Sequence, residues 1–279
     1  MAKTTIVIPN LGLQSYLEIC VASVYMHTQN QDYQIVIVNN QDPLKMYSPN
    51  LEYAMRQFQF NLENLKMDIM LPEENLGFPK SCNEGARRVA PGQYTPGGVN
   101  ALHFEPSEFL VFLNNDCVVH PGWLDAMIKT YESNPKTGVV GVWSNYVVGI
   151  QSVFSGMAHL EKPLWGVKMI KGICILVGAE RFWEVGGFDE EYSKMGWHSD
   201  DDLSLKMMEK GYFNVISPTF VTHFGSRTFK ELGVDLDTNP DILADRRRFH
   251  VKWDKVLRTV ETKENESLSE RSASGGKVE

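Results

Sequence analysis

A single carboxylate flanked by two amides follows an apolar run in the middle of the chain. Asp116 comes after Asn114 and Asn115, and the five residues before them, 109–113, read F-L-V-F-L. A short unbroken apolar run is typical of a strand buried on both faces of a sheet. Ligands of open parallel sheets bind outside the carboxyl ends of the strands, and hard divalent cations prefer oxygen ligands. The stretch predicts a metal or ligand site, although Asn and Asp are equally typical of an ordinary turn.

A second group of acids lies in the later part of the chain, where Asp200, Asp201 and Asp202 are consecutive. One Asp commonly caps a helix, and acids in the first turn suit the helix dipole. Three neighbouring carboxylates repel one another, which favours a cation or a catalytic use over capping alone. His223 follows a late apolar segment. A lone histidine is more often structural, but its position at a strand end favours a site.

Alternating strands and helices are expected to position these residues, and the first half predicts right-handed parallel crossovers. Strands are expected at residues 4–9, 33–38, 67–71, 109–113, 137–143, 172–178 and 212–216. Helices are expected at residues 13–27, 51–65, 80–89, 121–133, 179–185, 199–211 and 241–260. The Gly- and Pro-rich residues 91–108 predict a loop, and the polar residues 261–279 predict disorder.

The composition excludes several classes of protein. The 279 residues carry a net charge of −8 with a pI near 5.4, so no stable nucleic-acid complex is expected. The four cysteines are scattered without a C-x-x-C pair, which predicts buried thiols in a reducing compartment. No signal peptide is visible, and no apolar run is long enough to cross a bilayer. A cytoplasmic location is expected, with peripheral contact at the inner face of a membrane left open.

Seven short segments carry a family resemblance through their order. They are I-V-I-P-N, V-I-V-N-N-Q-D, N-L-G-F-P-K-S-C-N-E-G, F-L-N-N-D-C-V-V-H-P-G-W, V-G-G-F-D-E-E-Y, D-D-D-L-S-L-K-M-M-E-K-G-Y and T-H-F-G-S. Each is weakly specific alone, but together they span about residues 4 to 229. In this order they resemble a family 2 glycosyltransferase with the GT-A fold, near its rhamnosyltransferase-like branch.

The resemblance implies an α/β architecture with a Rossmann-like, mostly parallel central sheet flanked by helices. Residues 1–230 would form the glycosyltransferase domain, with a nucleotide-sugar-binding half at 1–120 and an acceptor-binding half at 121–230. Residues 231–260 would form a C-terminal helical extension, followed by the tail at 261–279.

The resemblance also implies residue roles. The nucleotide sugar would contact Pro9, Asn39, Asn40, Asp42, Gly77, Asn83, Asn114, Asn115 and Asp116. Asp116 and His223 would bind the metal. Asp200 would be the general base and Asp202 a second catalytic candidate. Because Ser199 stands where the family often has Glu, it stays open whether Asp200, Asp201 or Asp202 is the base. The acceptor would contact Gly187, Phe188, Asp189, Trp197 and His198.

Three positions depart from the family pattern. Asn114 replaces the first acid of the D-x-D motif, Asn39 stands where the family often has Asp, and Ser199 stands where it often has Glu. With one acid in place of two, metal binding would depend on Asp116 with help from His223 or from the diphosphate itself.

The activity implied is transfer of a hexosyl or deoxyhexosyl group, an EC 2.4 reaction, from a UDP-, dTDP- or GDP-sugar to an acceptor hydroxyl. Inversion by single displacement is expected, assisted by Mn²⁺ or Mg²⁺ as a Lewis acid. The expected acceptor is a glycan or lipid-linked saccharide, as in polysaccharide biosynthesis. One alternative is a non-catalytic nucleotide-sugar or glycan binding module on a degenerate GT-A fold. A sugar-phosphate nucleotidyltransferase is disfavoured, because the loop after the first strand, P-N-L-G-L-Q-S, has no basic residue.

Basic and aromatic residues also cluster at 246–255. A solvated helix face is the favoured interpretation, and contact with an anionic acceptor, a membrane surface or nucleic acid is the alternative.

Overall fold

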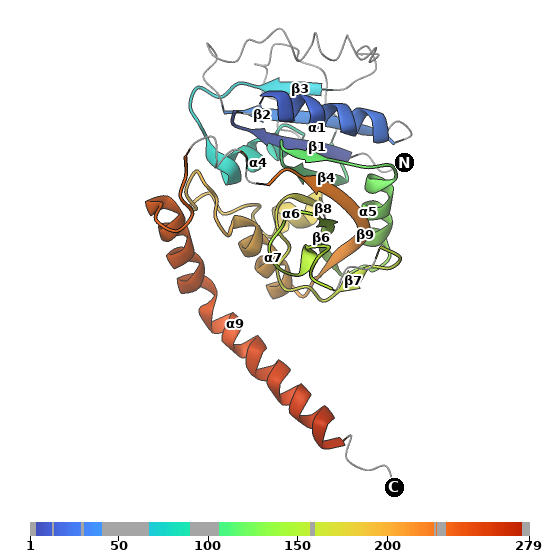
Figure 1. The fold of residues 1–279 in the computed structure, drawn as a ribbon, viewed down its shortest axis with the longest axis vertical. Coiled ribbons are helices and arrows are strands. Elements are labelled where there is room, and N and C mark those ends of the chain that lie inside the picture. The colour runs from blue at the N-terminus through green and yellow to red at the C-terminus, as the bar shows by residue number, and fades with distance from the viewer. Residues whose placement is uncertain are drawn as a thin grey trace.

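A computed structural model describes residues 4–12, 14–28, 31–40, 67–89, 106–156, 160–225, 227 and 233–274, with side chains to residue 257. Within these residues the strands form one nine-stranded sheet in the order β3-β2-β1-β4-β8-β6-β9-β5, with β7 pairing to β9. Figure 1 shows the sheet at the centre of the molecule with helices on both of its faces. The helix expected at 51–65, the loop at 91–105 and the predicted ligand Asp42 lie outside the described residues.

The first half of the sheet is parallel. Its strands are β1 (Thr4–Asn10), β2 (Tyr33–Asn39), β3 (Met67–Met70) and β4 (Phe109–Leu113). They are all paired in parallel, so their carboxyl ends meet at one edge, where Asn10 lies opposite Asn39. The apolar run at 109–113 is buried along its whole length, as the sequence predicts.

The second half of the sheet is mixed. It contains β5 (Cys117–Val118), β6 (Thr137–Ser144), β7 (Leu164–Trp165), β8 (Cys174–Gly178) and β9 (Phe213–His223). β8 runs antiparallel to both β4 and β6, and β9 is antiparallel to β5 and β7. The strands β6 and β9 are paired in parallel, so the expected parallel pairing is complete in the first half of the sheet and partial in the second. Apolar patterning cannot distinguish these directions, because a strand buried on both faces looks the same whichever way it runs.

Helices cover both faces of the sheet and build two apolar layers. Helix α1 (Gln14–His27) and α5 (Trp123–Glu132) pack on one face. Helices α4 (Gly77–Arg87), α6 (Ala179–Glu184) and α7 (Ser199–Glu209) pack on the other. The short helix η2 spans Gly149–Gln151. The predicted α/β class with flanking helices is thus present in the structure.

A long C-terminal helix, α9 (Pro240–Ser274), projects from the body of the protein in Figure 1. Its first turns are docked, since Phe249 and Trp253 pack with Leu205 of α7 and with Tyr192. The helix continues through residues 261–274, which the low hydrophobicity of the sequence suggested to be disordered. Low hydrophobicity predicts solvent exposure, but Glu, Lys, Arg and Leu also have high helix propensity. No helix in the described part of the chain has both the length and the apolar content needed to cross a membrane.

Candidate active site

The carboxyl ends of β1, β2 and β4 form the floor of a pocket. The lining residues are Pro9, Asn10, Leu11, Asn40, Asn75, Gly77, Phe78, Asn114, Asn115, Asp116, Lys194, Met195 and His223. Of the predicted nucleotide-sugar ligands, Pro9, Asn40, Gly77, Asn114, Asn115 and Asp116 line this pocket. The structure thus gathers residues from strand ends that are far apart in the sequence.

Amide side chains tie the strand ends together beneath the pocket. Asn10 Nδ2 donates to Asn39 Oδ1 at 3.1 Å, and Asn115 Nδ2 donates to Asn10 Oδ1 at 2.5 Å. Asn40 donates to the Asn10 carbonyl and to Ser81 Oγ, while its Oδ1 accepts from the Leu76 N–H. A carboxamide has two N–H donors, so the donors of Asn40 are fully used inside the protein. Asn40 therefore shapes the pocket. Within the described part of the chain, Asn10 and Asn115 each retain hydrogen-bonding capacity for a ligand.

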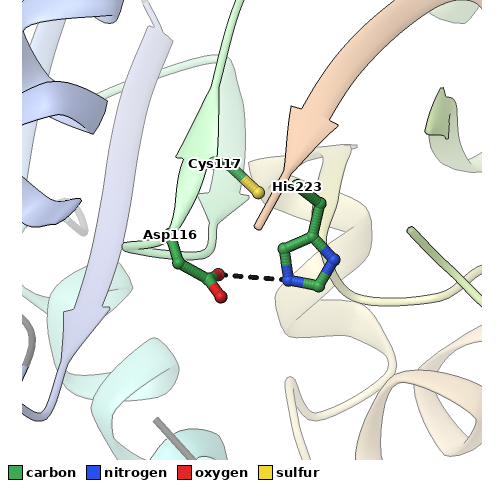
Figure 2. Close-up of side chains that lie close together, drawn as sticks. All are labelled: Asp116, Cys117 and His223. Atoms are coloured by element: carbon green, nitrogen blue, oxygen red, sulfur yellow. Dashed lines mark ion pairs between the residues drawn. The ribbon is translucent and has the colours of Figure 1, made fainter. Parts of the chain in front are cut away.

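Asp116 and His223 face each other at the edge of the pocket. Cys117 lies opposite His223 in the β5–β9 ladder, and this pairing brings Asp116 Oδ1 to 3.1 Å from His223 Nε2. Figure 2 shows the carboxylate and the imidazole pointing toward one another. Both residues are almost fully buried, and Asp116 Oδ2 also accepts a 3.3 Å hydrogen bond from the Arg227 N–H.

The tautomer of His223 follows from its second contact. Nδ1 lies 2.6 Å from the Tyr146 carbonyl oxygen, which can only accept, so Nδ1 carries a proton. Burial alone would lower the pKa of His223, but the hydrogen bond and the charge of Asp116, with the Tyr146 carbonyl, raise it above its ordinary value. The charge and hydrogen bond of Asp116 thus favour the protonated form of the His223 imidazole. When Nε2 loses its proton, it presents a lone pair on the same side as Asp116.

These two residues fit a divalent cation. A carboxylate oxygen and a neutral imidazole are both suitable ligands for Mn²⁺, and a cation of this type accepts further oxygens from phosphate or water. Cys117 also has its sulfur within 4.8 Å of these ligand atoms. Its thiol is fully buried and lies against the Ile173 carbonyl, and burial raises its pKa well above the ordinary value. Cys117 is thus a neutral neighbour of the pair.

The acid run at the start of α7 has three different surroundings. Asp201 binds Lys171 Nζ through both carboxylate oxygens at 2.7 Å and His198 Nδ1 at 2.6 Å. Asp202 is completely buried, and its Oδ1 accepts from Trp253 Nε1 at 2.8 Å and lies 2.7 Å from Lys252 Nζ. The mutual repulsion of three acids is thus relieved by cations of this protein, a possibility that the sequence did not reveal.

Asp200 does not line the pocket but is linked to it through the backbone of residues 172 and 173. Its Oδ2 accepts from the Gly172 N–H at 2.7 Å, and the next residue, Ile173, accepts through its carbonyl from the Asn114 N–H at 3.0 Å. Burial and the neighbouring Asp201 carboxylate raise the pKa of Asp200, against the opposing effect of Lys171. A carboxylate with a raised pKa is a stronger base.

Other predicted site residues have internal partners. Asn83 Nδ2 donates to the Phe188 carbonyl and to Glu190, so Asn83 joins α4 to the 187–190 segment and does not line the pocket. Phe188 is buried among Phe78, Phe112 and Phe182. The Gly187 carbonyl accepts from Lys206, and Asp189 pairs with Arg248 and Lys252, whose charges lower its pKa against the effect of burial.

Trp197 and His198 are held by α9. The Trp197 N–H donates to Asp245, and its ring lies beneath the guanidinium of Arg246. The His198 ring stacks on Phe249 at 4.5 Å, and its backbone has a left-handed φ of 67°. Such a φ is uncommon outside glycine, and the contacts of the ring with Phe249 and Asp201 maintain it.

Sequence reasoning missed part of the pocket wall. Asn10 directly follows Pro9 at a strand end, so the rule that marked Asn114 could have found it. Lys194 and Met195 follow no strand and belong to no motif, so the sequence carried no signal for them. The wall forms because Gly77, with a φ of 75°, packs against residue 194, and a Cβ added there would lie 2.3 Å from Lys194 Cα.

Comparison with known proteins identifies the family. The model of glycosyl transferase family 2 matches residues 5–168, more than half of the chain. This chain belongs to glycosyl transferase family 2. The predicted family is thereby confirmed.

Solved glycosyltransferase structures share the fold of this family 2 member. GalNAc-T7 with UDP, GalNAc and Mn²⁺ superposes with a TM-score of 0.61 at 15% identity, covering 80% of this chain and 44% of that one. The mannosyltransferase PcManGT from Pyrobaculum calidifontis, with GDP-Man and Mn²⁺, gives a TM-score of 0.57 at 16% identity, covering 99% and 76%. These likenesses confirm the GT-A fold.

A curated relative is the O-antigen biosynthesis protein RfbC of Myxococcus xanthus, 29% identical over 37% of this chain and 10% of that protein. The family 2 chain thus spans a small part of this relative and less than half of GalNAc-T7.

Proposed function

We propose that this protein transfers a hexosyl or deoxyhexosyl group from a nucleotide-diphosphate sugar to an acceptor hydroxyl, with inversion at the anomeric carbon. The observation that carries the proposal is the adjacency of two sites. The Asp116–His223 pair faces the pocket, and Asp200 is joined to the same edge through residues 172–174. A single displacement needs one site that stabilises the anionic leaving group and a base that takes the proton of the acceptor.

In this proposal the nucleotide lies over the strand ends of β1 and β2. Asn10 and Asn115 offer their remaining donors and acceptors to it, on a floor that Asn40 holds rigid. The diphosphate lies toward Asp116 and His223. A divalent cation held by these two residues would neutralise the negative charge that develops on the leaving diphosphate.

Asp200 is proposed to accept the proton of the acceptor hydroxyl. The hydroxyl oxygen forms the new glycosidic bond as the bond between the anomeric carbon and the diphosphate oxygen breaks, and the proton passes to the Asp200 carboxylate. The backbone N–H groups of Gly172 and Asp201 orient this carboxylate. Asp202 is proposed to be structural, because its buried carboxylate contacts groups of the protein itself.

The proposed donors are UDP-, dTDP- or GDP-sugars, and the proposed acceptor is a glycan or lipid-linked saccharide. UDP and GDP-Man accompany the two structural relatives, and the O-antigen role is that of the RfbC relative. The donor and acceptor classes are therefore proposals for this chain. We also propose that the protein associates peripherally with the inner face of a membrane.

A donor panel tests the proposal. Nucleotide release is measured for UDP-, GDP- and dTDP-sugars with Mn²⁺, with Mg²⁺ and with EDTA. Metal-dependent release from at least one donor is expected. Binding of a donor without release, even with an acceptor mixture added, would instead support a non-catalytic nucleotide-sugar binding module. No binding of any donor would contradict both functions.

A further inference from the structure

The first turns of α9 are connected to the wall of the nucleotide pocket. Asp245 of α9 is 2% exposed and accepts three hydrogen bonds from a loop that precedes α7. The donors are the Ser193 N–H at 2.7 Å, Ser193 Oγ at 2.7 Å and the Trp197 N–H at 2.9 Å. One carboxylate thus holds both ends of the segment 193–197.

The middle of this segment forms the pocket wall. Lys194 and Met195 line the pocket, and the Lys194 carbonyl accepts from the Phe78 N–H at 3.0 Å. Phe78 belongs to the first turn of α4, directly after Gly77, which Lys194 contacts too closely for any side chain at position 77. The wall is therefore held from one side by α4 and from the other by Asp245.

Residues 193–197 also contact both neighbouring helices directly: Gly196 packs closely against Phe78 and Pro79 of α4, and the Trp197 ring lies against Arg246 of α9. Lys194 is exposed, with its side chain 54% accessible, and its ammonium lies 4.0 Å from the exposed Glu74, a contact of small energy. Phe249 and Trp253 make apolar contacts of α9 one and two turns beyond Asp245, and the buried Ile242 lies before it. The charge-assisted hydrogen bonds of Asp245 fix the backbone of this segment to α9 at both ends, at Ser193 and at Trp197.

We propose that Asp245 is a positioning residue that sets the wall of the donor pocket, which makes α9 part of the nucleotide-sugar site. The inference depends on the proposed function, since it takes the pocket to bind a nucleoside diphosphate. The family model ends at residue 168, so this role belongs to a part of the chain beyond the matched region.

The test compares Asp245→Ala, Asp245→Asn and Ser193→Ala with the control Asp241→Asn, an exposed acid one turn earlier on α9. Binding of UDP, GDP and dTDP is measured by calorimetry with Mn²⁺. Affinity for the nucleotide that the wild type prefers is expected to fall about tenfold in Asp245→Ala, since a loss of about 1.4 kcal/mol corresponds to tenfold. Smaller losses, about threefold, are expected in Asp245→Asn and Ser193→Ala, which each keep part of the hydrogen-bond set. The control should bind as the wild type does.

Hydrogen exchange separates this inference from the proposed function, because it needs no ligand. In Asp245→Ala the amides of residues 193–197 and of Phe78 should exchange faster, while amides around Trp253 stay protected. Unchanged exchange at 193–197 would overturn the inference, whether or not the wild type binds nucleotide. Faster exchange with unchanged nucleotide affinity would also overturn it. If the wild type bound no nucleoside diphosphate, both the proposed function and the role of Asp245 in nucleotide binding would be rejected. Faster exchange in Asp245→Ala would then show only that Asp245 holds residues 193–197 in place.

Discussion

The two acidic sites of this protein are built in opposite ways. Asp116 lies at a strand end, and its strongest contact is His223, from another strand end at the same pocket. Asp201 and Asp202 lie in the first turn of a helix and are neutralised by Lys171 and Lys252 of the chain itself. An acid whose partners leave it facing a pocket can bind a ligand, whereas an acid whose partners enclose it stabilises the fold. Asp200 is the exception within its run, because its partners are backbone N–H groups beside the pocket.

Removing Asp116 should have the largest effect. Asp116→Ala takes away the proposed carboxylate ligand and removes the ion-pair partner of His223. We therefore expect sugar transfer to fall about a thousandfold or more, in the range of losing a main electrostatic contact. Initial rates at saturating donor measure the loss, with Glu132→Ala, an exposed acid on α5, as control. Activity within a few-fold of the wild type would show that Asp116 holds neither the cation nor the diphosphate.

Replacing Asp200 should separate chemistry from binding. Asp200→Asn keeps the hydrogen bond from the Gly172 N–H but cannot take a proton, so kcat should fall by about a hundredfold to ten-thousandfold. Nucleotide affinity should change little, because Asp200 does not line the pocket. Glu209→Gln, at the exposed end of the same helix, is the matched control. A comparable loss of nucleotide affinity would place Asp200 in the donor site and deny it the role of base.

Asp202 should affect stability more than chemistry. Asp202→Ala leaves Lys252, Lys206 and the indole N–H of Trp253 without their buried acceptor. Breaking a buried pair costs several kcal/mol, but both lysines are partly accessible to water, so we expect a loss of about 2 kcal/mol in the free energy of unfolding. Urea denaturation measures this value. If Asp202→Ala kept the full free energy of unfolding but lost sugar transfer, Asp202 would instead be a catalytic residue, as the family motif suggested.

The smallest effect concerns the pH dependence of the Asp116–His223 pair. The pKa of His223 is raised in the fold, so protonated His223 stabilises the metal-free protein below the unfolded pKa of about 6.5. This stabilisation is lost as the pH rises through the higher folded pKa. The wild type in EDTA should therefore lose its stability advantage over His223→Gln as the pH increases. Mn²⁺ affinity should change in the other direction, rising with pH as Nε2 loses its proton.

Denaturation curves and Mn²⁺ titrations across this pH range check both trends. Parallel pH profiles for the wild type and His223→Gln would contradict the raised pKa of His223.

The sequence alone determined the strand ends and therefore the pocket floor. Runs such as 109–113 are apolar without interruption, so the first polar residues after them must lie at the edge of a buried sheet. That local rule places Asn40, Asn114, Asn115 and Asp116 without any knowledge of distant contacts. The same rule places His223 at a strand end, although its strand continues past the predicted residue 216 and runs antiparallel to β5.

Tertiary structure decided what distant segments contribute. Three consecutive Asp residues look alike in the sequence, and only the positions of Lys171, Gly172 and Lys252 distinguish the enclosed acids from Asp200. Asn83 and Phe188 belong to family motifs, but in the structure Asn83 donates a hydrogen bond to the Phe188 carbonyl in the protein interior. Lys194 lies at the pocket because Gly77 has no side chain to block it and because Asp245 binds the loop that contains it. Both contacts join residues that are far apart in the sequence. Local sequence patterns indicate which residues are buried and where the chain turns. The ion-pair partner of a buried charge depends on tertiary contacts between distant segments.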